Sequence, residues 1–235
     1  MTEQERKAPL DMKDITVDVG AVSKEEAVEK FGIRIGEPVV PDVTFTYSET
    51  TDLMVGKSFD CRLGCAAILK TMHTLAGQEL NVDIVGACAA QEEVGVRGAT
   101  VTAQVIKPDI AIVFEGCPAD DTFTPDYFIQ TAMKKGPMLR HFDRSMVTNH
   151  VSRDSLWSLA ENWASRFRNR FVPAAAPMVV QSTPPTAVFR SSSSVFRFVT
   201  SILITVLPLW KTTRTAVKLA VEIIKRLNDE KIKSF

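Results

Sequence analysis

Two nearly unbroken apolar runs constrain the fold of this chain more than any other feature of its sequence. Residues 81–90 and residues 109–114 have the length of strands, and their apolar side chains do not alternate with polar ones, as in strands buried on both faces. Between these runs, residues 98–106 read as a short helix that Pro108 ends. Residues 61–76 carry apolar side chains at helical spacing. Strands that alternate with helices predict an α/β fold with a mainly parallel sheet and flanking helices.

Both ends of the chain carry simpler patterns. Residues 14–19 alternate polar and apolar side chains and predict a strand closed by Gly20. The stretch from Ser23 to Glu26 resembles a capping box, which predicts a short helix that ends near Gly32. In residues 216–231, apolar side chains form one stripe with lysines toward the end, which predicts a C-terminal helix.

Charge and hydropathy exclude several classes of protein. The 28 basic residues balance the 28 acidic ones, so the basic excess of a nucleic-acid-binding protein is absent. The run at 198–210 contains 13 residues and is interrupted by Pro208, whereas a membrane helix needs about 20. Residues 1–13 lack the apolar region of a signal peptide. We therefore expect a cytoplasmic protein with no nucleic-acid or membrane partner, and its four cysteines as reduced thiols packed in the core.

Acidic residues come directly after apolar runs at three places in the sequence. Asp60 comes after residues 55–59, Glu92 and Glu93 come after the run at 81–90, and Glu115 comes after the run at 109–114. Ligands of open parallel sheets bind at the carboxyl ends of the strands. One such acid alone is more often a solvated loop residue, but three similar placements favour a shared site. Two divalent ions about 3.5–4 Å apart need a bridging carboxylate and further ligands. Asp60 suits the bridge, Glu93 and Glu115 suit terminal ligands, and Glu92 suits a general base toward a metal-bound water.

Several segments around these acids resemble one peptidase family. Residues 56–65, GKSFDCRLGC, are similar to the GKAFDNRxGC segment of the glutamyl and deblocking aminopeptidases, and residues 91–99, QEEVGVRGA, are similar to their QEEVGxRGA. Residues 115–121 match the strand-end acid segment of that family, and residues 136–137 and 143–146 match its next segments toward the C-terminus. Residues 19–27 resemble the end of its small inserted β domain. The resemblance covers residues 14–149 nearly continuously, and also residues 216–228.

The resemblance implies a mechanism and a set of ligands. The family consists of dinuclear metallo-aminopeptidases that assemble as tetrahedral dodecamers. By resemblance, Asp60 bridges two divalent ions, Glu92 is the general base, and Glu93 and Glu115 are metal ligands. Zinc, cobalt and manganese are the candidate ions, peptides are the substrates, and a homo-oligomer is expected. Cys61 stands where many members have asparagine, and we expect little effect from this difference.

The family also uses two histidine ligands that have no visible counterpart in this chain. One precedes the inserted domain, and the chain begins inside that domain. The other lies in a segment like RYIHSH near the C-terminus. His73 and His141 read as structural residues, and His150 lies at the edge of a segment with an unusual composition.

Residues 150–215 differ in composition from the rest of the chain. No glycine occurs after Gly136, and the only acidic residues in this segment are Asp154 and Glu161. We interpret the segment as the product of a shifted reading frame. With permitted codons, reading one base earlier turns residues 174–183 into GGGTNGGAIH and residues 196–205 into VPVRYIHSHY. These strings resemble the glycine-rich substrate loop of the family and its missing histidine segment. We expect residues 150–215 to be poorly ordered and readily cleaved by proteases.

Four parts of the chain are therefore expected. Residues 1–50 would be the remnant of the inserted β domain, residues 51–149 the metal-binding α/β core, residues 150–215 the anomalous segment and residues 216–235 the C-terminal helix. The predicted function is that of a metal-dependent aminopeptidase, impaired or inactive in this chain. One alternative is a non-enzymatic remnant or an inert subunit of an oligomer. Another is a dinuclear hydrolase that acts on a different substrate, such as an acylated amino acid.

Overall fold

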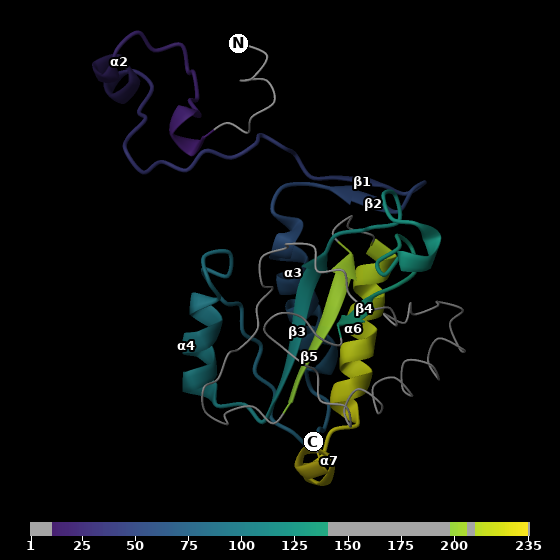
Figure 1. The fold of residues 1–235 in the computed structure, drawn as a ribbon. Helices are drawn as coiled ribbons and strands as arrows, with labels where there is room; N and C mark the ends of the chain where they lie inside the picture. Colours follow the sequence, from purple (N-terminus) through teal and green to yellow (C-terminus); the bar gives the residue numbers. More distant parts are fainter. Residues whose placement is uncertain (1–10, 141–197, 206–209, 235) are drawn as a thin grey trace. The chain divides into compact units, whose positions relative to one another are not determined.

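The chain divides into two compact units. The computed structural model of the chain describes residues 11–140, 198–205 and 210–234 (Figure 1). The first unit is Met1–Asp42 and the second is Val43–Phe235. The second unit combines helices with a small sheet, so the predicted α/β class is confirmed.

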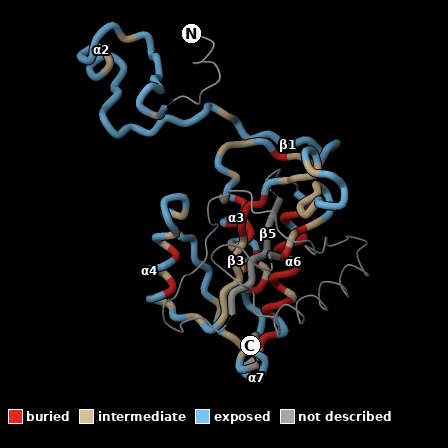
Figure 2. The backbone as a smooth tube through the Cα atoms, viewed as in Figure 1, coloured by how far each residue is buried: buried red, intermediate tan, exposed pale blue. Residues whose placement is uncertain are grey.

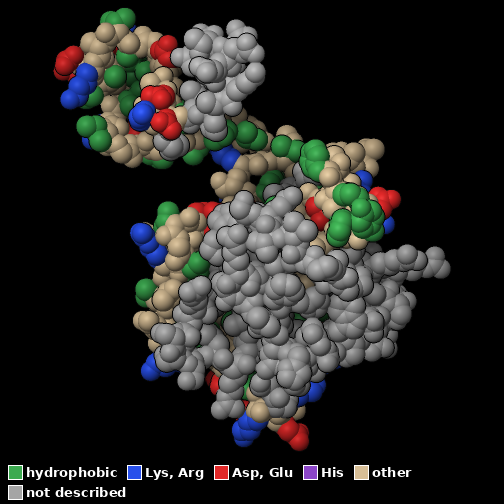
Figure 3. Space-filling view, in the orientation of Figure 1, with side chains coloured by type: hydrophobic (Ala, Val, Ile, Leu, Met, Phe, Trp, Pro, Cys, Tyr) green, Lys and Arg blue, Asp and Glu red, His purple; other side chains and the backbone are tan. Residues whose placement is uncertain are grey.

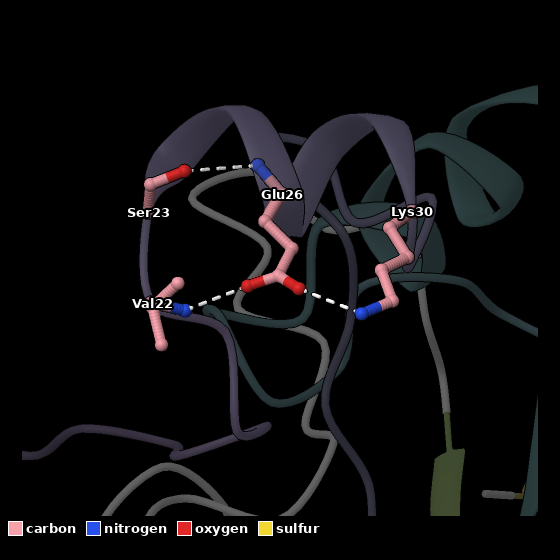
Figure 4. A network of polar contacts seen from close by, with 4 residues as sticks. All are labelled: Val22, Ser23, Glu26 and Lys30. Carbon is pink, nitrogen blue, oxygen red and sulfur yellow. Dashed lines mark hydrogen bonds and ion pairs between the residues drawn. The ribbon is translucent and has the colours of Figure 1, made fainter.

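The predicted capping box forms at the start of helix α2 (Lys24–Glu29) in the first unit. The Ser23 hydroxyl accepts a hydrogen bond from the Glu26 backbone N–H at 3.1 Å. The Glu26 carboxylate in turn accepts from the backbone N–H of Val22 at 2.9 Å and from the Lys30 ammonium group at 2.7 Å (Figure 4). These contacts satisfy backbone donors that the first turn of a helix leaves without partners. The pKa of Glu26 is lowered, chiefly by the Lys30 hydrogen bond.

The predicted strand at residues 14–19 is not found. The 3-10 helix η1 covers Met12–Asp14, and residues 15–19 form neither helix nor strand. Ile15 and Val17 are more than half exposed, because no neighbouring strand in residues 11–42 pairs with this stretch. An alternating pattern becomes a strand only when a partner satisfies its backbone groups.

Acidic and basic side chains are intermingled on the surface of the first unit (Figure 3).

The described sheet of the second unit is small and combines parallel with antiparallel pairs, so a mainly parallel sheet is not shown. Strands β3 (Ile110–Cys117), β5 (Phe198–Thr205) and β4 (Met138–Arg140) are hydrogen-bonded in the order β3-β5-β4. Strand β5 runs parallel to β3 and antiparallel to β4. A separate antiparallel hairpin pairs β1 (Thr46–Ser48) with β2 (Leu53–Val55). The first part of the apolar run at 198–210 thus forms β5, the central strand of this sheet.

The first of the two apolar runs, residues 81–90, is not a strand among the described residues. Val82 and Ile84 pack against the core, but residues 85–90 are exposed. Gly86 lies against helix α3 (Phe59–Leu75), where an added Cβ would come within 3.1 Å of the Ile68 and Met72 side chains. The prediction is wrong because apolarity favours burial, whereas strand formation also needs a hydrogen-bonding neighbour.

The helices cover the sheet and form the core with it. Helix α3 packs on β3, and helix α6 (Trp210–Lys225) packs on β5 and on α3 (Figure 1). The remaining helices are α4 (Arg97–Ile106), η2 (Asp126–Phe128) and α7 (Asp229–Ser234). Figure 2 shows that α6 is the most continuously buried helix among the described residues. The predicted helices at 61–76 and 98–106 are confirmed, and the C-terminal helix starts earlier than predicted, at Trp210. None of the helices within 11–140 and 210–234 has the length and apolarity that a membrane crossing requires.

Truncation of Leu219 in α6 is expected to destabilise the second unit strongly. This side chain is 1% exposed and belongs to the core cluster. Leu219→Ala should lower the free energy of unfolding by about 2–5 kcal/mol, because it leaves a cavity in a packed core. Leu69→Ala on α3 is the matched control, since Leu69 is 68% exposed and its truncation should change stability by about 0.5 kcal/mol or less. Urea denaturation followed by circular dichroism measures both, and equal losses would contradict the assignment of α6 to the core.

Candidate metal centre

Asp60 lies in the first turn of α3, where the backbone departs from helical geometry. Its backbone angles are φ −85° and ψ 106°, and nearby Ser58 is left-handed with φ 55°. The peptide bond between Asp60 and Cys61 is cis. Asp60 is exposed, at the point where the loop from β2 enters α3.

Glu115 lies inside strand β3, because the strand continues to Cys117, beyond the predicted end at residue 114. Its side chain is 5% exposed, and its Oε1 accepts a hydrogen bond from the Gly116 backbone N–H at 2.7 Å. Glu115 stands opposite Leu203 in the parallel pairing with β5. A carboxylate buried in a strand costs free energy unless it is paired or binds a cation.

A close approach of α3 to β3 brings the two acids together. A Cβ added at Gly64 would lie 2.8 Å from the Phe114 carbonyl oxygen and 2.8 Å from the Cys61 sulfur. Only glycine leaves room for this approach, one residue before Glu115. As a result, ligand atoms of Asp60, Cys61 and Glu115 all lie within 4.8 Å of one another.

The charges at this cluster suit a divalent cation. The pKa of Glu115 is raised, chiefly by burial and also by the negative charges of Asp60 and Glu92. Hydrogen bonds from Gly116 and Cys61 oppose that rise in pKa. Within the described parts of the chain, no lysine or arginine forms an ion pair with Asp60 or Glu115. Two neighbouring carboxylates without a cationic side chain match the oxygen donors that divalent ions take.

Glu92 and Glu93 lie on a tight turn that precedes α4. The Glu92 carbonyl accepts hydrogen bonds from the N–H groups of Gly95 and Val96 at 3.0 and 2.9 Å, and the Gly98 N–H donates to the Ala90 carbonyl at 2.9 Å. Val96 has a left-handed φ of 59°, a strained conformation for a β-branched residue. The turn is thus held in one conformation by its own backbone.

The two glutamates of this turn differ in their relation to the cluster. Glu92 is half-buried, and its charge is one of the causes that raise the pKa of Glu115. Glu93 is exposed and does not belong to the group formed by Asp60, Cys61 and Glu115. The structure thus brings Asp60 and Glu115 together, and it leaves both glutamates of the turn outside the group of ligand atoms.

The cysteines differ from their predicted role. Only Cys117 is buried, whereas Cys61 is half-buried and Cys65 and Cys88 are exposed, all four as free thiols. Burial and the nearby Glu115 charge raise the pKa of Cys61 above its usual range. The sequence led us to expect little effect from cysteine in place of asparagine at Cys61. Its position next to Asp60 was a signal that its side chain could belong to the same site.

A hollow of about 300 Å³ lies apart from this cluster. It is lined by the β1–β2 turn at residues 49–52, by Lys134 and Gly136, and by Lys211, Thr212 and Thr215 at the start of α6. Asp52 is already engaged there, because it accepts hydrogen bonds from the Lys211 N–H and the Tyr47 hydroxyl. None of the predicted site residues lines this hollow.

The metal-free chain is expected to lose stability as the pH rises above about 4.5, in part because of Glu115. The folded chain keeps the Glu115 proton at pH values where the unfolded chain, with the ordinary pKa of 4.5, has released it. The unfolded state then binds fewer protons, so the free energy of unfolding falls with rising pH. Glu115→Gln should remove this contribution and stabilise the chain near neutral pH. Glu79→Gln, at an exposed position, is the control.

Urea unfolding in the presence of a chelator, repeated from pH 4.5 to neutrality, measures this effect. The difference between the wild type and Glu115→Gln isolates the contribution of one carboxyl group. A difference that stays constant over the whole range would show that burial does not perturb Glu115.

Comparisons with known proteins show which family the chain resembles. Residues 1–173 match the model of the family described as M42 glutamyl aminopeptidase. That matched range ends inside the segment predicted to be anomalous. The FrvX protein of Escherichia coli K12 is 38% identical over 152 residues, which are 63% of this chain and 41% of that protein. The glutamyl aminopeptidase of Lactococcus lactis is 35% identical over 132 residues, which are 56% of this chain and 36% of that enzyme.

A solved structure is similar to this chain. The TET aminopeptidase of the archaeon Thaumarchaeota archaeon SCGC AB-539-E09 superposes with a TM-score of 0.81 at 30% identity, over 100% of this chain and 65% of the archaeal one. The chain spans about two-fifths of the length of the curated relatives it matches. The family is one of metallopeptidases, which implies the use of divalent metal ions. From its matched residues, its fold and its cluster of carboxylates, the chain belongs to the M42 glutamyl aminopeptidase family.

Proposed function

We propose that this chain carries the metal-binding core of a metal-dependent aminopeptidase, which hydrolyses the N-terminal peptide bond of peptides. The observation that carries the proposal is the convergence of Asp60, from the start of α3, and Glu115, from β3, within 4.8 Å in a member of a glutamyl aminopeptidase family. These residues come from separate elements, so their meeting depends on the fold and not on a local motif.

The roles arise from the chemistry of the residues. Asp60 would bridge two divalent ions, and Glu93 and Glu115 would each complete the ligands of one ion. When bound, zinc, cobalt or manganese ions would supply Lewis acidity and lower the pKa of a water molecule. Glu92 would take the proton of the attacking water and pass it to the leaving amine. Its half-buried position and the effect of its charge on the pKa of Glu115 support this role. For Glu93, which is exposed, the side chain would have to turn toward the ions.

Activity of this chain is proposed to be impaired, because residues 150–215 include the region expected to hold a substrate loop and a histidine ligand. Most of that segment lies outside the described residues. Sequencing the coding DNA tests the proposed change of reading frame. An open alternative frame that encodes a glycine-rich loop and a histidine segment is expected. If the alternative frames contain stop codons throughout this region, the reading-frame hypothesis fails.

Hydrolysis of aminoacyl-nitroanilides by the full chain with added zinc, cobalt or manganese tests the enzymatic proposal. If metal-dependent turnover is measurable, Glu92→Gln should lower kcat by about 10²–10⁴-fold, because the general base is removed. Metal affinity should change little in this variant. Glu79→Gln should leave both quantities unchanged. Turnover that survives Glu92→Gln would contradict the role of Glu92.

Two other outcomes define the alternatives. Metal binding without any turnover favours a non-enzymatic remnant or an inert subunit, for which the atypical composition of residues 150–215 is the supporting observation. Release of free amino acid from acylated amino acids, without hydrolysis of aminoacyl-nitroanilides, favours the other dinuclear hydrolase. We also propose a cytoplasmic homo-oligomer, and light scattering of the purified chain measures its mass.

A further inference from the structure

Cys61 is a third side chain at the carboxylate cluster that the proposed ligand set does not use. Its sulfur lies within 4.8 Å of carboxylate oxygens of both Asp60 and Glu115. The thiol makes a long hydrogen bond, 3.9 Å from its sulfur to the Phe114 carbonyl oxygen, and a thiol is a weak donor. The half-buried thiol also interacts with the Glu115 carboxylate, so it is already directed toward a proposed ligand.

We propose that Cys61 is a ligand of the ion held by Asp60 and Glu115, and that its thiolate makes this site favour soft cations over hard ones. The inference rests on the proposed metal site, and it adds a ligand that the resemblance to the family does not supply. Many members have asparagine at this position, so the preference would be particular to this chain.

The distances fit one ion bound by all three side chains. Zinc lies about 2.3 Å from a thiolate sulfur and about 2.0–2.2 Å from a carboxylate oxygen, so two tetrahedral ligands of one ion lie roughly 3.5 Å apart. The three ligand atoms lie within 4.8 Å of one another without an ion. Side-chain rotations that shift these atoms by about an ångström would bring them to the separation expected around one ion.

The chemistry of the donor set decides the preference. Oxygen-only sites discriminate poorly among divalent ions, whereas one thiolate shifts the preference toward zinc and cadmium and away from manganese. On binding, the sulfur–metal bond forms as the thiol releases its proton to solvent, with no change of oxidation state. This site would therefore bind cadmium or zinc more tightly than manganese.

The other cysteines provide matched controls. Cys65 lies one helical turn beyond Cys61 on α3, and its thiol interacts with that of Cys88. Both are exposed, and neither belongs to the group formed with Asp60 and Glu115. Cys65→Ser and Cys88→Ser therefore each remove one accessible thiol without touching the proposed ligands.

Cobalt titration of the chelator-stripped full chain tests the proposal directly. The wild type is expected to develop a thiolate-to-cobalt charge-transfer absorption in the near ultraviolet. Cys61→Ser and Cys61→Asn should lose it, and Cys65→Ser and Cys88→Ser should keep it. In calorimetry, the ratio of cadmium to manganese affinity should fall at least about 10-fold in both Cys61 variants. Circular dichroism checks that each variant is folded, and Cys61→Asn has the residue that many relatives carry.

The possible failures are distinguishable. Cobalt that binds with no thiolate absorption, and with equal affinity in Cys61→Ser, would overturn the role of Cys61 and leave the carboxylate site intact. An absorption that persists in both Cys61 variants and disappears in Cys65→Ser would also overturn it, because another thiol would then hold the metal. A wild-type chain that is folded and binds no divalent ion would refute the proposed metal site together with this inference.

Discussion

Replacing Asp60 with asparagine is expected to weaken the binding of divalent ions by the full chain at least about 100-fold. Loss of a residue that only orients a ligand typically costs 10–100-fold in metal affinity, and Asp60 is proposed to contact both ions directly. An amide is neutral and offers one acceptor oxygen, so it can neither balance the charge nor bridge two ions. Calorimetry with zinc measures the loss.

Asp83→Asn is the matched control for this substitution, since Asp83 is exposed and outside the cluster. Its zinc affinity should equal that of the wild type. The same substitution at Asp60 also removes one of the charges that raise the pKa of Glu115, so the folded protein should not be destabilised. If Asp60→Asn bound zinc as tightly as the wild type, Asp60 could not be the bridging ligand.

Replacing Gly98 with alanine is expected to disrupt the turn that carries Glu92 and Glu93. An added Cβ would overlap the carbonyl oxygen of Ala90 and lie 2.6 Å from the Ala90 nitrogen. Both contacts are with backbone, which cannot rotate away as a side chain can. The cost should be about 1–3 kcal/mol of unfolding free energy. Zinc affinity should also fall, because Ala90 must move and the turn begins there.

Gly77→Ala is the matched control for this effect. An added Cβ at Gly77 meets no atom within 4 Å, although its φ of +74° strains any other residue by about 1–2 kcal/mol. Both variants should therefore lose stability in urea denaturation, but only Gly98→Ala should lose zinc affinity. Equal zinc affinities for the two variants would show that the turn does not position metal ligands.

Local patterns in the sequence predicted several elements correctly. Helical spacing predicted α3 and α4, and the capping residues at Ser23 and Glu26 predicted the start of α2. These features depend on interactions between residues three or four positions apart, which a single sequence displays. The family motifs also include Asp60 and Glu115, which the structure brings together.

The errors concern interactions between distant parts of the chain. Residues 81–90 have the apolar composition of a buried strand but no strand partner among the described residues, and residues 14–19 lack one as well. The pairing of β5 between β3 and β4 joins segments that are far apart in sequence and have no local signal for register. Exposed Cys65 and Cys88 were predicted to be buried for the same reason, since apolar neighbours do not reveal which face of an element is covered.

By itself, the sequence determined that the chain is an α/β protein with helices at α3 and α4, and it identified the acidic residues of a peptidase family. Only the tertiary structure decided which of these residues meet. Gly64 allows α3 to approach β3 closely enough for Asp60 and Glu115 to share one site. The same approach adds the Cys61 sulfur to the cluster. The physical reason is that helix and cap signals come from short-range backbone and side-chain contacts, whereas a metal site requires the packing of elements that sequence spacing does not specify.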